Sequence, residues 1–271
     1  MTTWLITGCS TGLGRSLAEA VLEAGSNAVV TARDPRAVED LVSAYPRTGA
    51  AVALDVTKTD QVARAVEFAE QRFGGVDVLV NNAGYGYRGA VEEGDAEEVA
   101  DLFATNVFGA VAMIKAVLPG MRARRRGAIL NVSSIAGRLA APGSGYYSAT
   151  KFALEGMSDA LRKEVGPLGI RVVVVEPGAF RTDFAGRSLR QAGAAIPDYA
   201  RTAGPRRKEN DGTHGTQPGD PARGARAHRD RRGGEGAVPA AARRRRGGQG
   251  HRRARGPAPG DRGLEGRQHQ H

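Results

Sequence analysis

Short apolar runs alternate with amphipathic segments along the first 175 residues, and this pattern predicts strands and helices in turn. Several runs are apolar throughout, which is typical of strands that are buried on both faces of a sheet. We expect six strands, at residues 5–7, 28–31, 51–54, 76–80, 128–132 and 170–175. Apolar positions at helical spacing predict helices between them, at residues 13–24, 36–45, 60–73, 95–123 and 146–165. Alternating strands and helices predict an α/β fold, a doubly wound parallel sheet of the Rossmann type in a single domain.

The pattern loosens after Pro177 and disappears after Pro221, where the composition changes. The net charge of the chain is +10, and residues 222–271 carry all of this excess, with 14 Arg and 4 acidic residues. We therefore expect a catalytic domain over residues 1–221 and a disordered Arg/Gly-rich tail over 222–271, because the tail has too few apolar residues to form a core. We favour a frameshifted reading of the gene as its origin, and an RNA-binding segment is the alternative.

The composition also excludes several classes of protein. A single Cys excludes an internal disulfide framework and a Cys-based metal cluster, so we expect no metal site. No uninterrupted apolar run reaches the 18 or so residues of a membrane span, and the N-terminus lacks the pattern of a signal peptide. We expect a cytoplasmic protein that does not associate with membranes.

Three glycines follow the first predicted strand and open the first predicted helix. This arrangement is typical of a turn that binds the pyrophosphate of a dinucleotide, with the helix N-terminus facing the phosphates. A purely structural glycine turn is the alternative, and the position after the first strand of a βαβ unit disfavours it. The expected cofactor-binding residues of the turn are Gly8, Ser10, Thr11, Gly12, Leu13 and Gly14.

The end of the second strand bears on the choice between NAD(H) and NADP(H). Ala32 occupies the position where an acidic residue would bind the ribose 2′-hydroxyl of NAD, and Arg33 follows it. A guanidinium can bind a 2′-phosphate through two parallel hydrogen bonds, so we favour NADP(H) over NAD(H). In the alternative interpretation, Arg33 is a solvated cation that Asp34 partly neutralises.

Tyr147 and Lys151 lie four residues apart on a predicted helix and therefore share one face. An ammonium beside a phenol is expected to lower the Tyr pKa from about 10 toward neutrality, which suits a general acid or base. Tyr146 competes for the role but has no Lys four residues later. Ser134 ends the fifth strand at the sheet edge where such folds bind ligands, and Asn106 is an unusual residue within a helix.

These motifs together resemble the short-chain dehydrogenase/reductase family in its compact single-domain form, with similarity to the steroid- and retinol-dehydrogenase-like subset. The resemblance covers residues 3 to about 190. It rests on the glycine turn, the Asn-Asn-Ala-Gly run at 81–84, Tyr147-x3-Lys151 and the run Pro177-Gly178-x3-Thr182, all at family spacing.

The resemblance implies a role for each matching residue. Tyr147 would be the general acid/base, Lys151 would lower its pKa and bind the nicotinamide ribose, and Ser134 would orient the substrate oxygen. Asn106 would hold a water in a proton relay. The further residues expected to contact the cofactor are Asp55, Val56, Asn82, Ala83, Gly84, Pro177, Gly178 and Thr182.

The resemblance also implies a mobile substrate lid over about residues 179–215, with a small-molecule carbonyl or alcohol as substrate. The apolar content of the lid suggests a hydrophobic substrate, although the same residues could simply pack the lid on the body. The family forms homo-oligomers, but the altered C-terminus lacks the elements that build the contact, and we expect no specific nucleic-acid partner. A nucleotide-binding regulator, or an inactive remnant whose basic tail binds nucleic acid non-specifically, is the alternative function.

Overall fold

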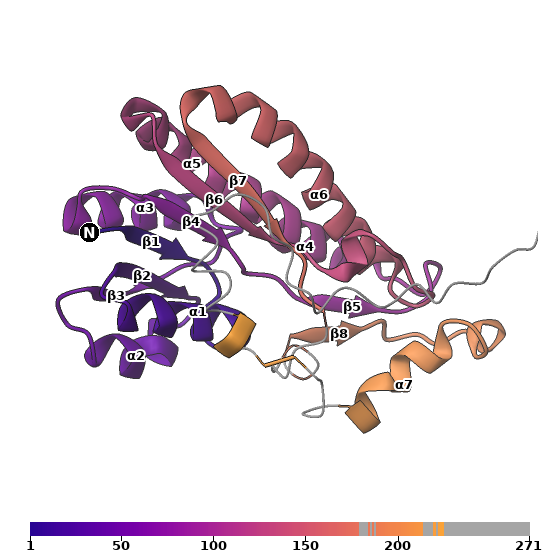
Figure 1. Cartoon of the computed structure of the whole chain (residues 1–271). Helices are drawn as coiled ribbons and strands as arrows, with labels where there is room; N and C mark the ends of the chain where they lie inside the picture. The colour runs from indigo at the N-terminus through magenta and orange to yellow at the C-terminus, as the bar shows by residue number, and fades with distance from the viewer. Residues whose placement is uncertain (179–183, 185, 187, 214–218, 221, 225–271) are drawn as a thin grey trace, which may run out of the picture. The chain divides into compact units, whose positions relative to one another are not determined.

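Six parallel strands form the central sheet, in the order β3-β2-β1-β4-β6-β7 (Figure 1). The chain starts in the middle at β1, builds outward to β3, and then returns to β4 on the other side of β1. The strand order thus reverses at β1 and β4, and doubly wound folds bind their ligands outside the carboxyl ends of the strands at such a reversal. The predicted fold class is confirmed. The strands are Thr3–Ile6 (β1), Asn27–Ala32 (β2), Gly49–Ala53 (β3), Val78–Asn81 (β4), Gly127–Val132 (β6) and Ile170–Val175 (β7).

The computed structural model describes residues 1–178, 184, 186, 188–213, 219, 220 and 222–224. The chain divides into Met1–Gly234 and Glu235–His271, and every described residue lies in the first of these units. The expected tail therefore lies outside the described residues from position 225 onward. The domain boundary expected at residue 221 stays a prediction.

Helices cover both faces of the sheet, as Figure 1 shows for α1 and α2 on one face and α3, α5 and α6 on the other. Strand β1 contributes side chains to the core on both faces of the sheet, because successive side chains of a strand point to opposite faces. Trp4 and Ile6 pack with α1 and α2, whereas Leu5 packs with α3 and α5. The bounds are Gly12–Glu23 (α1), Glu39–Ser43 (α2), Thr59–Phe73 (α3), Gly109–Arg124 (α5) and Gly145–Val165 (α6).

The single helix expected over residues 95–123 is interrupted. It consists of α4 (Ala96–Phe103), a π-helical turn (Ala104–Phe108) and α5. Asp95 caps α4, since its carboxylate accepts the backbone N–H groups of the next turn. The π turn carries Asn106 and bulges the helix at that position, a form of irregularity that is frequent at functional sites.

By length and composition alone, the run Ala96–Arg124 is the one helical stretch of the described structure that could span a membrane. Charged residues lie near both ends of this run, and Thr105, Asn106 and Lys115 interrupt the apolar sequence between them. Core helices that never enter a membrane meet the same criterion, and here α5 packs against α3, β4 and β6. The buried apolar residues of α5 belong to the core on the face of the sheet that α3 and α6 also cover.

Several short elements were not predicted because they are too brief to leave a periodic pattern. Two three-residue strands, β5 (Gly86–Arg88) and β8 (Leu189–Gln191), pair in parallel and connect the body to the segment beyond β7. The helix expected at 36–45 begins as a 3₁₀ turn and continues as the short α2. The remaining elements are the 3₁₀ turns Pro35–Val38, Ile135–Gly137, Gly166–Leu168 and Pro197–Tyr199, and the helix α7 (Gly204–Thr213).

Candidate active site

The glycine turn between β1 and α1 requires glycine for two different reasons. Gly8 and Gly12 have φ of +70° and +62°, in the left-handed region that residues with a Cβ rarely adopt. Gly14 has ordinary dihedrals but no space. A Cβ there would collide with Nδ2 of Asn82 and would lie 2.5 Å from the carbonyl oxygen of Gly8. The turn is therefore packed tightly against Asn82, which directly follows β4, the neighbour of β1 in the sheet.

Asn82 and Thr7 brace this turn. The side-chain amide of Asn82 donates to the carbonyl oxygens of Thr7 and Gly8, both at 2.9 Å. The hydroxyl of Thr7 accepts the backbone N–H groups of Asn82 and Ala83, both at 3.0 Å. The side chains of Asn82 and Thr7 thus hold the shape of the turn together. The sequence alone did not indicate this role for Thr7.

The N-terminus of α1 has the character of an anion site. Thr11 is its N-cap residue but makes no side-chain capping hydrogen bond, and the first turn holds no acidic residue. The first N–H groups of a helix need an acceptor, and a phosphate supplies one. The crowded cradle of Gly8, Gly12 and Gly14 and this uncapped terminus fit the pyrophosphate of a dinucleotide. Ser10 is exposed, and Leu13 is half-buried.

At the carboxyl end of β2, the last strand residue Ala32 is buried, and the next residue, Arg33, is exposed. The carboxylate of Asp34 pairs with Arg36 at 2.8 Å. Burial raises the pKa of Asp55, but hydrogen bonds from Thr57 and the charge of Arg33 bring that pKa below its ordinary value. Arg33 therefore lies near the predicted adenine-binding position. Val56, the next residue, is buried against Gly109.

Ser134 and Tyr147 are brought together beyond the carboxyl end of β6. The Ser134 hydroxyl accepts the N–H of Ala136 at 3.1 Å, and it lowers the pKa of the nearby Tyr147 phenol. Its neighbour Ser133 is buried on the other side of the chain. The competing Tyr146 points away, because its hydroxyl donates to the carbonyl oxygen of Val91 at 2.7 Å. The structure thus favours Ser134 over Ser133, and Tyr147 over Tyr146, as candidate catalytic residues.

The electrostatics of Tyr147 differ from the prediction. Burial raises the pKa of its phenol above the ordinary tyrosine value, and the hydrogen bond from Ser134 and the charge of Arg206 only partly oppose this. The expected lowering by Lys151 is wrong for the residues described. The Lys151 Nζ lies 5.7 Å from the centroid of the Tyr147 ring, and it donates to the carbonyl oxygen of Val132 at 2.9 Å. Tyr147 is a neutral phenol near pH 7 in this arrangement.

Lys151 itself is fully enclosed by the body. Burial lowers the pKa of its ammonium to about 8, and the negative charge of Glu155 acts in the opposite direction. Its neighbour Thr150 is also buried and hydrogen-bonds Asn106 of the π turn, whose Nδ2 lies 3.2 Å from the Thr150 hydroxyl. Asn106 further pairs with the backbone N–H and carbonyl of Tyr85, at 3.0 and 2.9 Å. It therefore joins the strand after Gly84 to the helix of Tyr147 and Lys151.

The segment after β7 reaches the site from the opposite side. The Phe184 ring packs against Tyr147 with centroids 5.7 Å apart. Arg206 of α7 donates to the Ser144 hydroxyl at 3.0 Å, close to the start of the Tyr147 helix. Pro177 accepts a hydrogen bond from the N–H of Ile135, Gly178 is exposed, and Thr182 lies outside the described residues.

A buried carboxylate that sequence reasoning missed holds this segment. Glu93 pairs with Arg207 of α7 at 2.9 Å, and only 3% of its side chain is exposed. It also accepts the N–H groups of Ala90 and Ile196, both at 2.8 Å. The hydrogen bonds from Arg207, Ile196 and Ala90 lower the pKa of Glu93 to about 2. An acidic residue in a loop gave no signal of this, because its partner lies 114 positions away.

Comparison with known proteins agrees with this geometry. Residues 2–193 match the family model of the short chain dehydrogenases. The chain is 42% identical over 202 residues to the oxidoreductase BOA17 of Botryotinia fuckeliana, covering 74% of this chain and 73% of that protein. It is 44% identical over 197 residues to the 3-ketodihydrosphingosine reductase of Bacteroides thetaiotaomicron, covering 72% and 71%.

Solved structures extend the match to three dimensions. A short-chain dehydrogenase from Streptomyces avermitilis matches with a TM-score of 0.81 and 44% identity, over 87% of this chain and 85% of that one. A gluconate 5-dehydrogenase from Burkholderia cenocepacia in complex with NADP and tartrate matches at 0.65 and 30%, over 68% and 74%. A short chain dehydrogenase/reductase from Burkholderia phymatum in complex with NAD matches at 0.75 and 25%, over 84% of each. The chain therefore belongs to the short-chain dehydrogenase/reductase family and is an oxidoreductase that interconverts an alcohol and a carbonyl with a nicotinamide cofactor.

Proposed function

We propose that the protein is an NADP(H)-dependent reductase of a hydrophobic ketone or aldehyde, able to run in reverse, with Tyr147 as its general acid/base. The observation that carries this proposal is that Ser134, just after β6, and Tyr147, in the first turn of α6, come together, with the buried Lys151 one helical turn beyond. The two hydroxyls converge at the sheet edge where the cofactor cradle also opens. A carbonyl oxygen that reaches both would be held and protonated at one point.

The bound nicotinamide supplies or accepts the hydride. The hydroxyl of Ser134 orients the substrate oxygen, and the phenol of Tyr147 donates its proton to that oxygen. A phenol with a raised pKa is protonated at neutral pH, which suits it as the acid in the direction of carbonyl reduction. The phenolate that remains is stabilised by the Ser134 hydroxyl and by the nearby charge of Arg206.

The position of Lys151 favours a second role on the cofactor. Its ammonium lies 3.8 Å from where a Cβ on Gly84 would be, so it faces the loop after β4. We propose that it binds the nicotinamide ribose there. Asn106 supports this arrangement through its bonds to Tyr85 and Thr150, which join the loop to the helix. A water relay that passes by Asn106 stays a prediction.

The preference for NADP(H) rests on Arg33. Its guanidinium is exposed at the end of β2, and Asp34, the neighbour that would have neutralised it, is paired with Arg36 instead. Because residue 32 is an alanine, no carboxylate lies at the position where it would repel a 2′-phosphate. These observations favour a phosphate-bearing ribose, since a guanidinium is suited to bidentate phosphate binding.

The preference for an apolar substrate rests on exposed hydrophobic side chains that follow Ser134 and on Phe184, which packs against Tyr147. Ile135 follows Ser134 directly and is 59% exposed, and Leu139, one turn further, is 70% exposed. Phe184 packs on the Tyr147 ring from the other side. Exposed apolar groups that gather at one place mark a binding surface. The name of the Bacteroides relative, a 3-ketodihydrosphingosine reductase, agrees with a ketone that carries an apolar remainder.

A cofactor oxidation assay tests the proposal. The full chain is incubated with NADPH or NADH and a series of ketones and aldehydes whose apolar chain is lengthened stepwise, and the absorbance of the reduced cofactor is followed. We expect turnover with NADPH that rises with chain length and falls at least tenfold in Ser134→Ala. Turnover that is equal with short polar carbonyls would contradict the substrate class, and equal rates with NADH would contradict the cofactor preference.

A further inference from the structure

Glu155 lies one helical turn after Lys151, on the same side of α6. Its side chain is only 12% exposed, although it carries a charge. One of its carboxylate oxygens, Oε1, is buried and has no hydrogen-bond partner among the described residues. The hydroxyl of Ser133 is buried and equally unpartnered within the described part of the chain, and both atoms border Gly137. Few donors screen the charge of this carboxylate, and in a low-dielectric interior such a charge acts strongly on a nearby cation.

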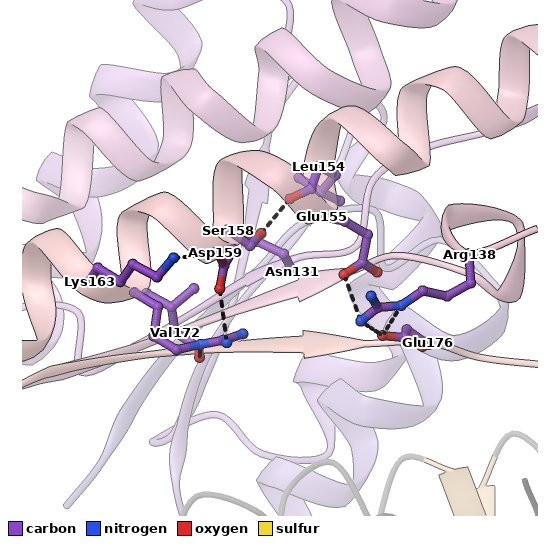
Figure 2. Close-up of polar contacts among 10 residues, drawn as sticks. Asn131, Arg138, Leu154, Glu155, Ser158, Asp159, Lys163, Val172 and Glu176 are labelled. Atoms are coloured by element: carbon purple, nitrogen blue, oxygen red, sulfur yellow. Dashed lines mark hydrogen bonds and ion pairs between the residues drawn. The ribbon is translucent and has the colours of Figure 1, made fainter. Parts of the chain in front are cut away.

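Arg138 is the cation that faces this carboxylate, and Figure 2 shows it between two acidic residues. It lies 3.4 Å from Oε2 of Glu155 but 2.8 Å from Oε1 of Glu176, to which its Nε also donates at 3.1 Å. Arg138 is shared between the two carboxylates and binds Glu176 with the better geometry. Its charge therefore neutralises Glu155 only in part. Arg138 is also 61% exposed, so water weakens its effect further.

We propose that Glu155 is a positioning residue for the reaction, whose incompletely neutralised carboxylate keeps the buried ammonium of Lys151 charged, and that Arg138 sets how strongly it does so. The inference rests on the proposed role of Lys151 beside Tyr147. Without Glu155, a lysine enclosed by the body would give up its proton more readily, since burial disfavours the charged form. The cation proposed to bind the cofactor ribose beside Tyr147 would then be lost within the working range of pH.

The surroundings of Lys151 leave Glu155 as its principal charged neighbour in the described structure. Burial lowers the pKa of Lys151, and Glu155 is the group that raises it again. The groups near Lys151 from other elements are neutral. The carbonyl of Val132 in β6 accepts its hydrogen bond, and the amide of Asn106 in the π turn borders Gly84 together with the ammonium. Of the other charges, Arg138 and Glu176 act through Glu155, and Arg206 faces Tyr147.

Direct titration of Lys151 is the first arm of the test. The full chain is labelled with ¹³C at lysine Cε, the Lys151 signal is assigned with Lys151→Arg, and its midpoint is followed by NMR. We expect Glu155→Gln to lower the midpoint by about one pH unit, the size expected for loss of one nearby opposite charge. We expect Arg138→Gln to raise it, because both carboxylates then lose their cation. Two shifts of opposite sign are not what general loosening of the fold would produce.

Asp159→Asn is the matched control, since Asp159 is the next carboxylate along α6. It is exposed and pairs with Lys163 at 2.8 Å (Figure 2). We expect it to leave the Lys151 midpoint in place. Arg138→Gln provides an independent variant if Glu155→Gln does not fold. A midpoint that neither substitution moves, or that Asp159→Asn moves equally, would overturn the proposal.

The second arm is the pH dependence of kcat/KM with NADPH and the best carbonyl of the panel. The basic limb should move to lower pH in Glu155→Gln and to higher pH in Arg138→Gln, in step with the NMR midpoints. If the midpoints move as expected and the rate profile does not, Glu155 still controls Lys151, and the proposed role of Lys151 in catalysis is contradicted instead.

Discussion

Arg207 of α7 and Glu93, in the loop after β5, form a buried ion pair, with Nη2 2.9 Å from Oε2. The same guanidinium donates to the carbonyl of Ala192, and the same carboxylate accepts the N–H of Ile196. The pair therefore ties the segment from β8 to α7 onto the body beside Tyr147. Arg206, the next residue of α7, is positioned by this anchor with its charge toward the Tyr147 phenol.

Replacing Glu93 by Gln should loosen this anchor. Removing one partner of a buried pair leaves the other charge uncompensated, so we expect a loss of about 3 kcal/mol in the free energy of unfolding. We also expect a higher KM, because the segment that carries Phe184 and Arg206 is no longer held. Urea unfolding and steady-state kinetics measure the two effects. Glu92→Gln is the control, since Glu92 is exposed and contacts only the Tyr199 hydroxyl among the described residues. Equal effects of both substitutions would contradict the anchor.

The same pair predicts a pH dependence of stability. The pKa of Glu93 is about 2 in the folded chain and 4.5 in its ordinary state, so the folded state favours the ionised form. A carboxyl with a lowered pKa stabilises the fold above its ordinary pKa and loses this effect as the pH falls through the folded value. The difference in unfolding free energy between the wild type and Glu93→Gln should be constant above about pH 5 and shrink toward pH 2. A difference that grows as the pH falls would have the wrong sign.

Gly14→Ala should abolish cofactor binding, because its Cβ would collide with Asn82 and Gly8 and displace the turn. Isothermal titration with NADPH measures the effect, and we expect at least a hundredfold loss of affinity, about 2.7 kcal/mol. Gly156→Ala is the matched control. It lies on α6, where an added Cβ would meet nothing within 4 Å, and alanine favours the helix. Retained affinity in Gly14→Ala would mean that the turn is not the phosphate site.

Arg33→Ala should weaken NADPH far more than NADH. Loss of hydrogen bonds to a charged group costs about 1.5–3 kcal/mol, so the KM for NADPH should rise roughly 10- to 100-fold. Arg36→Ala removes an equally exposed cation that is already paired with Asp34, and it should change neither cofactor's KM by more than about twofold. Equal losses for NADPH and NADH in Arg33→Ala would show that the guanidinium does not read the 2′-phosphate.

The central sheet was predictable because its strands are short runs rich in β-branched and aliphatic residues, of which Ile170 to Val175, interrupted only by Arg171, is the clearest. The candidate residues Ser134, Tyr147 and Lys151 were predictable because local spacing and strand ends bring them together. β5 and β8 were not, since three residues leave no period. Glu93 and Arg207 were missed because a tertiary pair so distant in sequence has no local signature. The pKa of Tyr147 was misjudged because burial, which spacing does not reveal, outweighs the opposing effects of Ser134 and Arg206 in the described structure.

Substitution of Tyr147 by Phe tests the account most directly. It removes one hydroxyl and keeps the ring that packs against Phe184, so the fold and the cofactor cradle should persist. We expect kcat for the best carbonyl substrate to fall by at least a thousandfold, within the range of general acid catalysis, while the Kd for NADPH changes less than about threefold. Turnover within tenfold of the wild type, with NADPH still bound, would contradict the assignment of Tyr147 as the proton donor.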